Sequence, residues 1–130
     1  MNPNNQIKVA IVDDHAIIRK CLDEILKLWG YSVLPQASNG KDFLDLLIKG
    51  IILDICILDM RMPEMDGYET IKAVKEKWPG IKIIAYSMDF KDPHTKQPDG
   101  ADAVLSKTGP YEQLKNVLAL LSSQIIAKVH

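Results

Sequence analysis

Short apolar runs alternate along this chain with longer stretches of helical period. The runs are KVAIV at 8–12, DICIL at 54–58, IKIIAY at 81–86 and AVLS at 103–106. They are rich in Val and Ile and only a few residues long, which is typical of strands buried on both faces of a sheet. Strands that alternate with helices predict a parallel α/β sheet, in which ligands bind outside the carboxyl ends of the strands.

The same patterning predicts the bounds of the individual elements. We expect strands at 8–12, 32–37, from 51 or 53 to 58, 82–86 and 103–105, and helices at 16–29, 40–49, 68–78 and 110–128. Ser38 or Asn39 is expected to cap the second helix, and Asp66 the third.

A regular helix is not expected between the last two strands. The segment MDFKDPHTKQPDG at 88–100 has Phe90 as its one large apolar residue beyond Met88, so it offers no stripe to bury. Pro98 blocks helical propagation through its own position. We therefore expect the fourth helix of the fold to be short or irregular.

The composition is that of one globular domain, with 47% hydrophobic and 25% charged residues among 130. We expect this domain at 7–128, after a disordered lead at 1–6. A net charge of −1 does not indicate a surface for nucleic acid or an anionic membrane. Cys21 and Cys56 lie in apolar surroundings and predict buried free thiols in a reducing compartment. No apolar stretch is long enough to span a membrane, so we expect a cytoplasmic protein.

Polar side chains follow four of the predicted strands where each strand ends. They are Asp13 and Asp14, Asp59, Ser87 and Lys107. Two carboxylates about 4 Å apart repel by roughly 4 kcal/mol at an effective dielectric of 20, so such a group needs raised pKa values or a cation. Oxygen ligands partly open to water suit Mg²⁺. With a metal present, Asp59 is a candidate nucleophile toward a phosphoryl group, with Lys107 and Ser87 on its oxygens.

Four polar residues also have plainer interpretations. Asp14 on its own is an even choice between a helix cap and a metal ligand. His15 follows the acidic pair directly, but Mg²⁺ does not favour imidazole, and a residue at a helix start usually faces solvent. Asp54 and Asp102 precede strands and are interpreted as structural.

At these positions the chain resembles the receiver domain of bacterial two-component response regulators. The resemblance lies in VAIVDDH at 9–15, ILDMRMPEMDG at 57–67, IIAYSM at 83–88 and GADAVLSK at 100–107. The chain is most similar to the NarL/LuxR-type subfamily in three segments, DDH at 13–15, SM at 87–88 and KTGPYEQL at 107–114. The fold that this resemblance implies is a flavodoxin-like parallel sheet of five strands, in the order 2-1-3-4-5, with helices on both faces.

The resemblance also implies a role in a two-component phosphorelay. Asp59 would accept a phosphoryl group from a histidine kinase or phosphotransfer protein, and the protein would then switch its contacts. Ser87 would hydrogen-bond that group and Lys107 would pair with it. The cofactor would be Mg²⁺, held by Asp14, Asp59, the backbone carbonyl of Arg61 and, through water, Asp13.

Outside the site the chain departs from the family pattern. Val104 stands three residues before Lys107, where the family usually has Tyr or Phe. A degraded fourth helix would expose Ile83, Ala85 and Val104, and exposed apolar patches often mark interfaces. We therefore expect contact with a partner, or a homodimer, through the face of the fourth helix, strand 5 and the last helix. NarL/LuxR-type regulators normally continue into a DNA-binding domain, so the chain is a fragment or a stand-alone receiver and is not itself expected to bind nucleic acid.

The leading interpretation is a signalling switch and not an enzyme with a diffusible substrate. A phosphatase with an aspartyl nucleophile commonly has a second Asp two residues later, where this chain has Arg61. A nucleotide- or flavin-binding module would need a phosphate-binding loop after the first strand, where this chain has Asp13-Asp14-His15. The alternative that stays open is a degenerate receiver that signals through protein contacts without phosphorylation.

Overall fold

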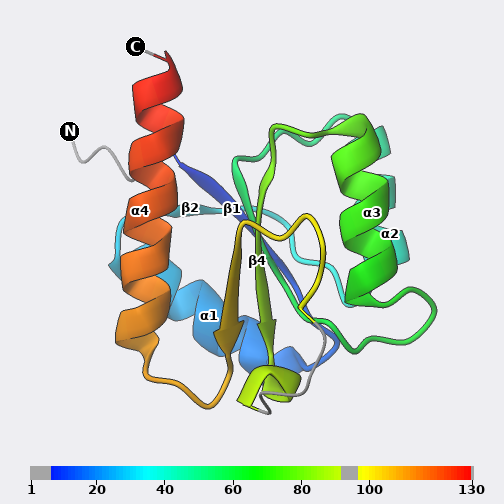
Figure 1. Ribbon diagram of the computed structural model, residues 1–130, viewed down its shortest axis with the longest axis horizontal. Coiled ribbons are helices and arrows are strands. Elements are labelled where there is room, and N and C mark those ends of the chain that lie inside the picture. The colour runs from blue at the N-terminus through cyan, green and yellow to red at the C-terminus, as the bar shows by residue number, and fades with distance from the viewer. Residues whose placement is uncertain (1–6, 92–96, 130) are drawn as a thin grey trace.

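Five parallel strands form one sheet in the order β2-β1-β3-β4-β5 (Figure 1). The computed structural model describes residues 7–91 and 97–129. The strands are β1 Lys8–Val12, β2 Ser32–Val33, β3 Ile55–Leu58, β4 Lys82–Ser87 and β5 Ala103–Ser106. The helices are α1 Ala16–Leu28, α2 Gly40–Ile48, α3 Gly67–Lys77, α4 Tyr111–Val129 and the short 3-10 helix η2 Met88–Lys91. This order confirms the predicted flavodoxin-like fold.

Helices cover both faces of the sheet and enclose two apolar cores. Helices α1 and α4 lie on one face, and α2 and α3 on the other (Figure 1). Alternate residues of the strands supply the two cores. Ile11 and Ile57 belong to the core under α1 and α4, whereas Cys56 and Leu58 belong to the core under α2 and α3. Strands β1 and β3 are almost completely buried, as predicted from their unbroken apolar runs.

The predicted caps of the second and third helices are confirmed. The Asn39 side chain accepts a hydrogen bond from the Asp42 backbone N–H at 2.8 Å. The Asp66 carboxylate accepts one from Glu69 N–H at 2.9 Å. Each cap satisfies an N–H group that the first helical turn leaves without a partner. Asp66 thereby fixes the start of α3 directly after the loop that follows β3.

The strand register brings the predicted polar residues to one edge of the sheet. Val12 pairs with Leu58, so Asp13 and Asp59 are the next residues on neighbouring strands. Asp59 N–H donates to the Val12 carbonyl at 2.8 Å. On the other side, Lys107 N–H donates to the Ser87 carbonyl at 3.1 Å. The backbone therefore fixes the carboxylates, Ser87 and Lys107 at the carboxyl ends of four adjacent strands.

Strand β2 is shorter than predicted. It covers Ser32–Val33 in place of 32–37, followed by an isolated bridge between Val12 and Ala37. Pro35 lies between these two pairings. Because proline has no backbone N–H, it cannot donate to the ladder at this point.

The fourth α-helix along the described chain is α4, which is 19 residues long and follows β5. It corresponds to the predicted last helix and is not short. The interval between β4 and β5, for which a short or irregular helix was predicted, contains η2 as its described helical part. Residues 92–96 and the predicted lead at 1–6 lie outside the described residues. The expected domain bounds at 7–128 therefore stay a prediction.

The expected exposure of the sheet beneath that interval is wrong for Ile83 and Ala85, which are fully buried. Phe90 from η2 packs against the core cluster that contains them, as does the partly buried Val104. A single aromatic ring from a short helix therefore contributes cover to a part of the sheet that was expected to be exposed.

The cysteine prediction is confirmed in part. Both thiols are free, but only Cys56 is buried, and Cys21 is exposed on α1. Burial raises the pKa of the Cys56 thiol well above its usual range. Among the described helices, none combines the length and the apolar character needed to cross a membrane.

Candidate functional site

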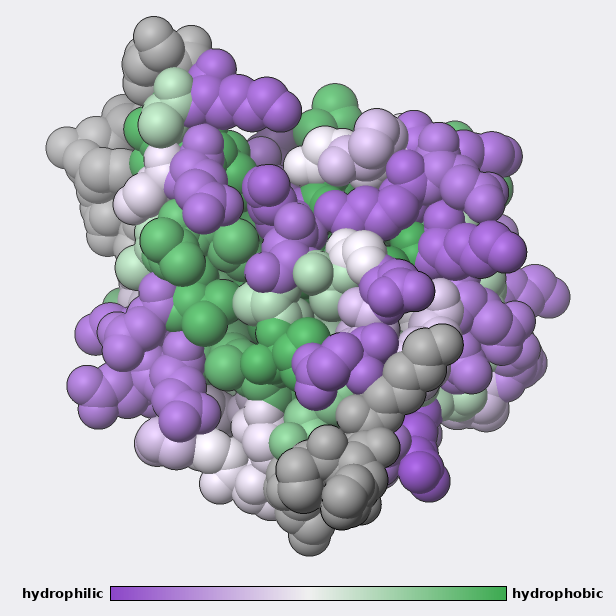
Figure 2. Space-filling view, viewed as in Figure 1, coloured by the Kyte–Doolittle hydropathy of each residue, from purple (hydrophilic) through white to green (hydrophobic). Residues whose placement is uncertain are grey.

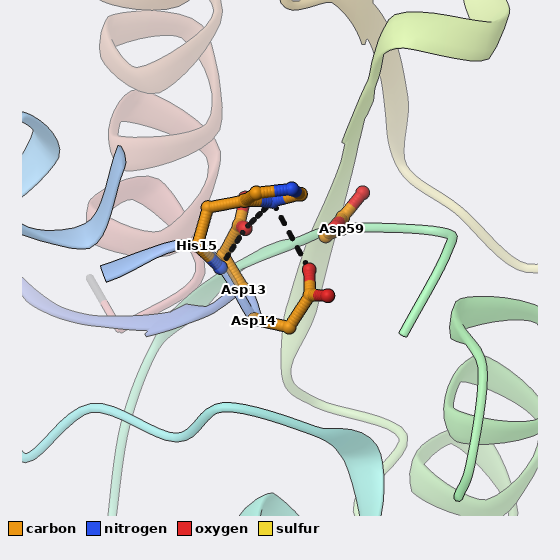
Figure 3. A group of neighbouring side chains, drawn as sticks. All are labelled: Asp13, Asp14, His15 and Asp59. Carbon is orange, nitrogen blue, oxygen red and sulfur yellow. Dashed lines mark hydrogen bonds and ion pairs between the residues drawn. The ribbon is translucent and has the colours of Figure 1, made fainter. Parts of the chain in front are cut away.

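Three carboxylates meet at the carboxyl ends of β1 and β3, together with the ring of His15 (Figure 3). One ligand atom from each of Asp13, Asp14, His15 and Asp59 lies within 4.8 Å of the others. Asp13 and Asp59 are buried, whereas Asp14 and His15 are open to solvent. The site therefore has a buried anionic floor and an accessible rim.

Lys107 supplies a positive charge beside the two buried carboxylates. Its Nζ lies 2.6 Å from Asp13 Oδ2 and 3.4 Å from Asp59 Oδ1. The three side chains expose only 3–5% of their surface. One buried ammonium therefore holds two buried carboxylates, which leaves a net negative charge beneath the rim.

Asp59 keeps one oxygen without a protein partner. Its Oδ1 accepts a weak hydrogen bond from Arg61 N–H at 3.4 Å, while the buried Oδ2 has no hydrogen-bond partner among the described residues. Burial raises the pKa of the Asp59 carboxyl from 3.8 to about 6, and the Asp13 charge adds to this against the opposing charge of Lys107. Such an oxygen is suited to bind a cation or to attack an electrophile.

Ser87, the last residue of β4, and Arg61, on the loop after β3, border the site. Ser87 is buried, and its Oγ accepts a hydrogen bond from Asp89 N–H at 3.3 Å. Arg61 Nε donates to Asp89 Oδ2 at 2.6 Å, which ties the loop after β3 to η2. The sequence did not predict this ion pair, because its partners are 28 residues apart, one on the loop after β3 and one in η2.

The loop after β3 closes against the strand it leaves. A Cβ atom on Gly67 would lie 2.5 Å from Met60 Sδ and 2.7 Å from the Asp59 carbonyl oxygen. Gly67 N–H also donates to the Met60 carbonyl at 3.0 Å. Only glycine permits this close approach, so Gly67 helps to fix the backbone that carries Asp59.

Gly67→Ala is expected to destabilise the protein by about 2 kcal/mol, because backbone atoms must move to admit the methyl group. The displacement should also weaken Mg²⁺ binding. Gly80→Ala is the matched control, since a Cβ there meets nothing within 4 Å. Urea unfolding and calorimetric Mg²⁺ titration of both variants test the expectation, and equal behaviour of the two would contradict it.

His15 begins α1 as its N-cap and keeps a side chain that is 60% exposed, as the sequence interpretation expected. Its Nδ1 also lies 3.0 Å from Asp13 Oδ1 and 3.1 Å from Asp14 Oδ1. As N-cap of α1, it makes no side-chain capping bond, and Asp14 is not the cap. The position of His15 directly after two acidic residues was the signal in the sequence for these contacts. The interpretation gave it less weight because Mg²⁺ prefers oxygen ligands to imidazole.

The residues present fit a divalent cation. Three carboxylates converge, and a buried Asp59 oxygen faces no protein donor among the described residues. Hard oxygen ligands that are partly open to water are those that Mg²⁺ uses in proteins. Asp13, Asp14 and Asp59 are therefore able to hold this ion together.

A parallel α/β sheet with carboxylates and a lysine at its carboxyl edge defines a class of proteins that bind a cation and an anionic group at this place. The model of the response regulator receiver domain matches residues 9–119. The chain therefore belongs to the response regulator receiver domain family, whose members act in two-component signalling. Its acidic site, with Asp13, Asp14, Asp59 and Lys107, is that of a phosphoacceptor receiver.

Individual relatives agree with this assignment. Histidine kinase CKI1 of Arabidopsis thaliana is 31% identical over an alignment that covers 90% of this chain but 12% of that protein. Chemotaxis protein CheY of Thermotoga maritima is 39% identical over 80 residues, 62% of this chain and 66% of that protein. The structure of response regulator TrrA from the same organism, in complex with Mg²⁺-BeF, superposes with a TM-score of 0.80. It is 28% identical, over 89% of this chain and 99% of that one.

Proposed function

We propose that Asp59 is the phosphoacceptor of this receiver and that a phosphohistidine of a histidine kinase or phosphotransfer protein is the donor. The observation that carries this proposal is the buried Asp59 Oδ2, which has no protein partner among the described residues although a lysine and two carboxylates surround it. One relative, CKI1, is itself named a histidine kinase, and the region that matches this chain is 12% of that protein. This relative supports a histidine kinase as the partner.

The reaction exchanges one phosphorus bond for another. An Asp59 oxygen attacks phosphorus, and the bond from phosphorus to the donor imidazole nitrogen breaks. The imidazole leaves with the electron pair, and an acyl phosphate forms on Asp59. Bound Mg²⁺ would supply the positive charge that offsets repulsion between the carboxylates and the phosphoryl oxygens.

Residues of the chain position the transferred group. Lys107 Nζ, 3.4 Å from Asp59 Oδ1, is near enough to pair with a phosphoryl oxygen on that carboxylate. Ser87 Oγ accepts from Asp89 N–H and donates to no acceptor among the described residues, so its hydrogen can go to the phosphoryl group. We assign the direct Mg²⁺ ligands to Asp14, Asp59 and the Arg61 carbonyl, with Asp13 acting through water.

A switch of protein contacts is the proposed output, and the protein is not proposed to be an enzyme with a diffusible substrate. Figure 2 shows apolar surface gathered over α4 and β5. Every β5 residue is partly exposed, and Leu120 of α4 is 59% exposed. Exposed apolar area at an edge strand supports a homodimer or partner contact there.

Two finer assignments are part of the proposal. The NarL/LuxR-type subfamily is proposed from DDH, SM and KTGPYEQL. A cytoplasmic location is proposed from the two free cysteines, which suit a reducing compartment.

The direct test is phosphorylation by acetyl phosphate, followed by intact mass. With Mg²⁺ we expect one added phosphoryl group per chain. In excess chelator we expect none, because the carboxylates would then repel the donor. Absence of label in Mg²⁺ would favour the degenerate receiver, which signals without phosphorylation.

A further inference from the structure

The His15 ring is held between two carboxylates of the site (Figure 3). Nδ1 lies 3.0 Å from Asp13 Oδ1 and 3.1 Å from Asp14 Oδ1, while Lys107 occupies the other Asp13 oxygen. Two ligand atoms that bind one ion at about 2.1 Å, at right or tetrahedral angles, lie roughly 3.0–3.4 Å apart. His15 Nδ1 therefore has the spacing of a neighbouring ligand toward both carboxylates.

A second observation points to a bound ion at the same place. Asp59 is buried, and its Oδ2 has no hydrogen-bond partner among the described residues. One oxygen of Asp59 lies within 4.8 Å of the ligand atoms of Asp13, Asp14 and His15. One nitrogen and three carboxylate oxygens can thus converge on one cation.

We propose that His15 is a metal-specificity residue, which adds an imidazole ligand and lets this site bind a first-row transition dication such as Zn²⁺ in competition with Mg²⁺. Imidazole suits Zn²⁺, whereas Mg²⁺ keeps oxygen ligands and water. The inference rests on the proposed function in one respect only, namely that both ions occupy the Asp59 site. A transition metal held there would compete with the Mg²⁺ that supports phosphorylation.

A capping role does not account for the position of the ring. His15 is the N-cap of α1 but makes no side-chain capping bond. Its backbone N–H and its Nδ1 instead both face Asp13 Oδ1, at 2.9 and 3.0 Å. Replacement of the ring therefore removes contacts with the acidic site without removing a helix cap.

Calorimetric titration with Zn²⁺ and, separately, with Mg²⁺ tests the proposal. We expect His15→Ala and His15→Phe to weaken Zn²⁺ binding about tenfold and to leave the Mg²⁺ affinity within about twofold. His15→Phe keeps the bulk of the ring without its nitrogens. Thermal unfolding in chelator verifies that each variant is folded.

Three controls make the result decisive. Asp59→Asn should weaken both metals, and excess Mg²⁺ should displace Zn²⁺ from the unaltered protein. The double variant His94→Ala/His130→Ala should retain full Zn²⁺ binding. Equal changes for Zn²⁺ and Mg²⁺ in the His15 variants, or none, would overturn the proposal. Loss of acetyl-phosphate labelling with a retained His15 effect would instead overturn the proposed phosphoacceptor function alone.

Discussion

Asp59→Asn is expected to abolish phosphoryl uptake and, at the same time, to make the protein more stable. The amide cannot form the acyl phosphate, so labelling by acetyl phosphate in Mg²⁺ should fall to background. Stability should rise because an ionised carboxylate no longer has to be buried beside Asp13. A loss of labelling caused by misfolding would come with lower stability, so the two measurements separate chemistry from folding.

The pH dependence fixes the sign of the stability change. The pKa of Asp59 is about 6 in the folded protein and 3.8 without its environment. The native state therefore binds more protons than the unfolded state between these values, and stability falls as pH rises from about 4 to 6. A shift of about two units corresponds to at most about 3 kcal/mol, and we expect Asp59→Asn to recover about 2 kcal/mol at pH 7.5 in chelator. Below pH 4 this gain should vanish.

Asp54→Asn is the matched control. Asp54 directly precedes the same strand at its opposite end, where its carboxylate accepts a hydrogen bond from Lys8 N–H at 2.8 Å. An amide oxygen can accept that bond, so labelling and stability should both stay near those of the unaltered protein. Labelling that survives in Asp59→Asn would remove Asp59 from the role assigned to it.

The sheet could be predicted from sequence because burial on both faces leaves a clear local pattern. The unbroken apolar runs of β1 and β3 and the capping residues Asn39 and Asp66 each act within a few residues. The end of β2 depends on Pro35 within a weak edge pairing. Phe90 packs against the core cluster that contains Ile83, and no local pattern reveals this tertiary contact.

The site was predictable to the extent that strand ends determine it. Asp13, Asp59, Ser87 and Lys107 follow from parallel pairing alone, since neighbouring strands end at one edge. The contacts of His15 and the Arg61–Asp89 pair depend on rotamers and on loop paths. Those contacts make up the rim of the site, where side chains have more freedom than on its floor.

Lys107→Met is expected to destabilise the protein by about 3 kcal/mol at pH 7.5 in chelator. The substitution keeps much of the side-chain volume but leaves Asp13 and Asp59 buried without their cation. Removal of one partner from a buried ion pair typically costs 3–5 kcal/mol, and proton uptake by Asp59 limits the cost here. The penalty should grow as pH rises, because each carboxylate that ionises then lacks the lysine.

Two comparisons separate this electrostatic cost from loss of packing. Asp13→Asn in the Lys107→Met background should recover a large part of the stability, since one of the two unpaired charges is gone. Lys77→Met, at an exposed lysine of α3, should stay within about 0.5 kcal/mol of the unaltered protein.

Mg²⁺ should also stabilise Lys107→Met more than the unaltered protein, because a cation among the carboxylates replaces the missing charge. Urea unfolding with and without Mg²⁺ measures all three, and a penalty that neither Asp13→Asn nor Mg²⁺ reduces would show that Lys107 acts through packing.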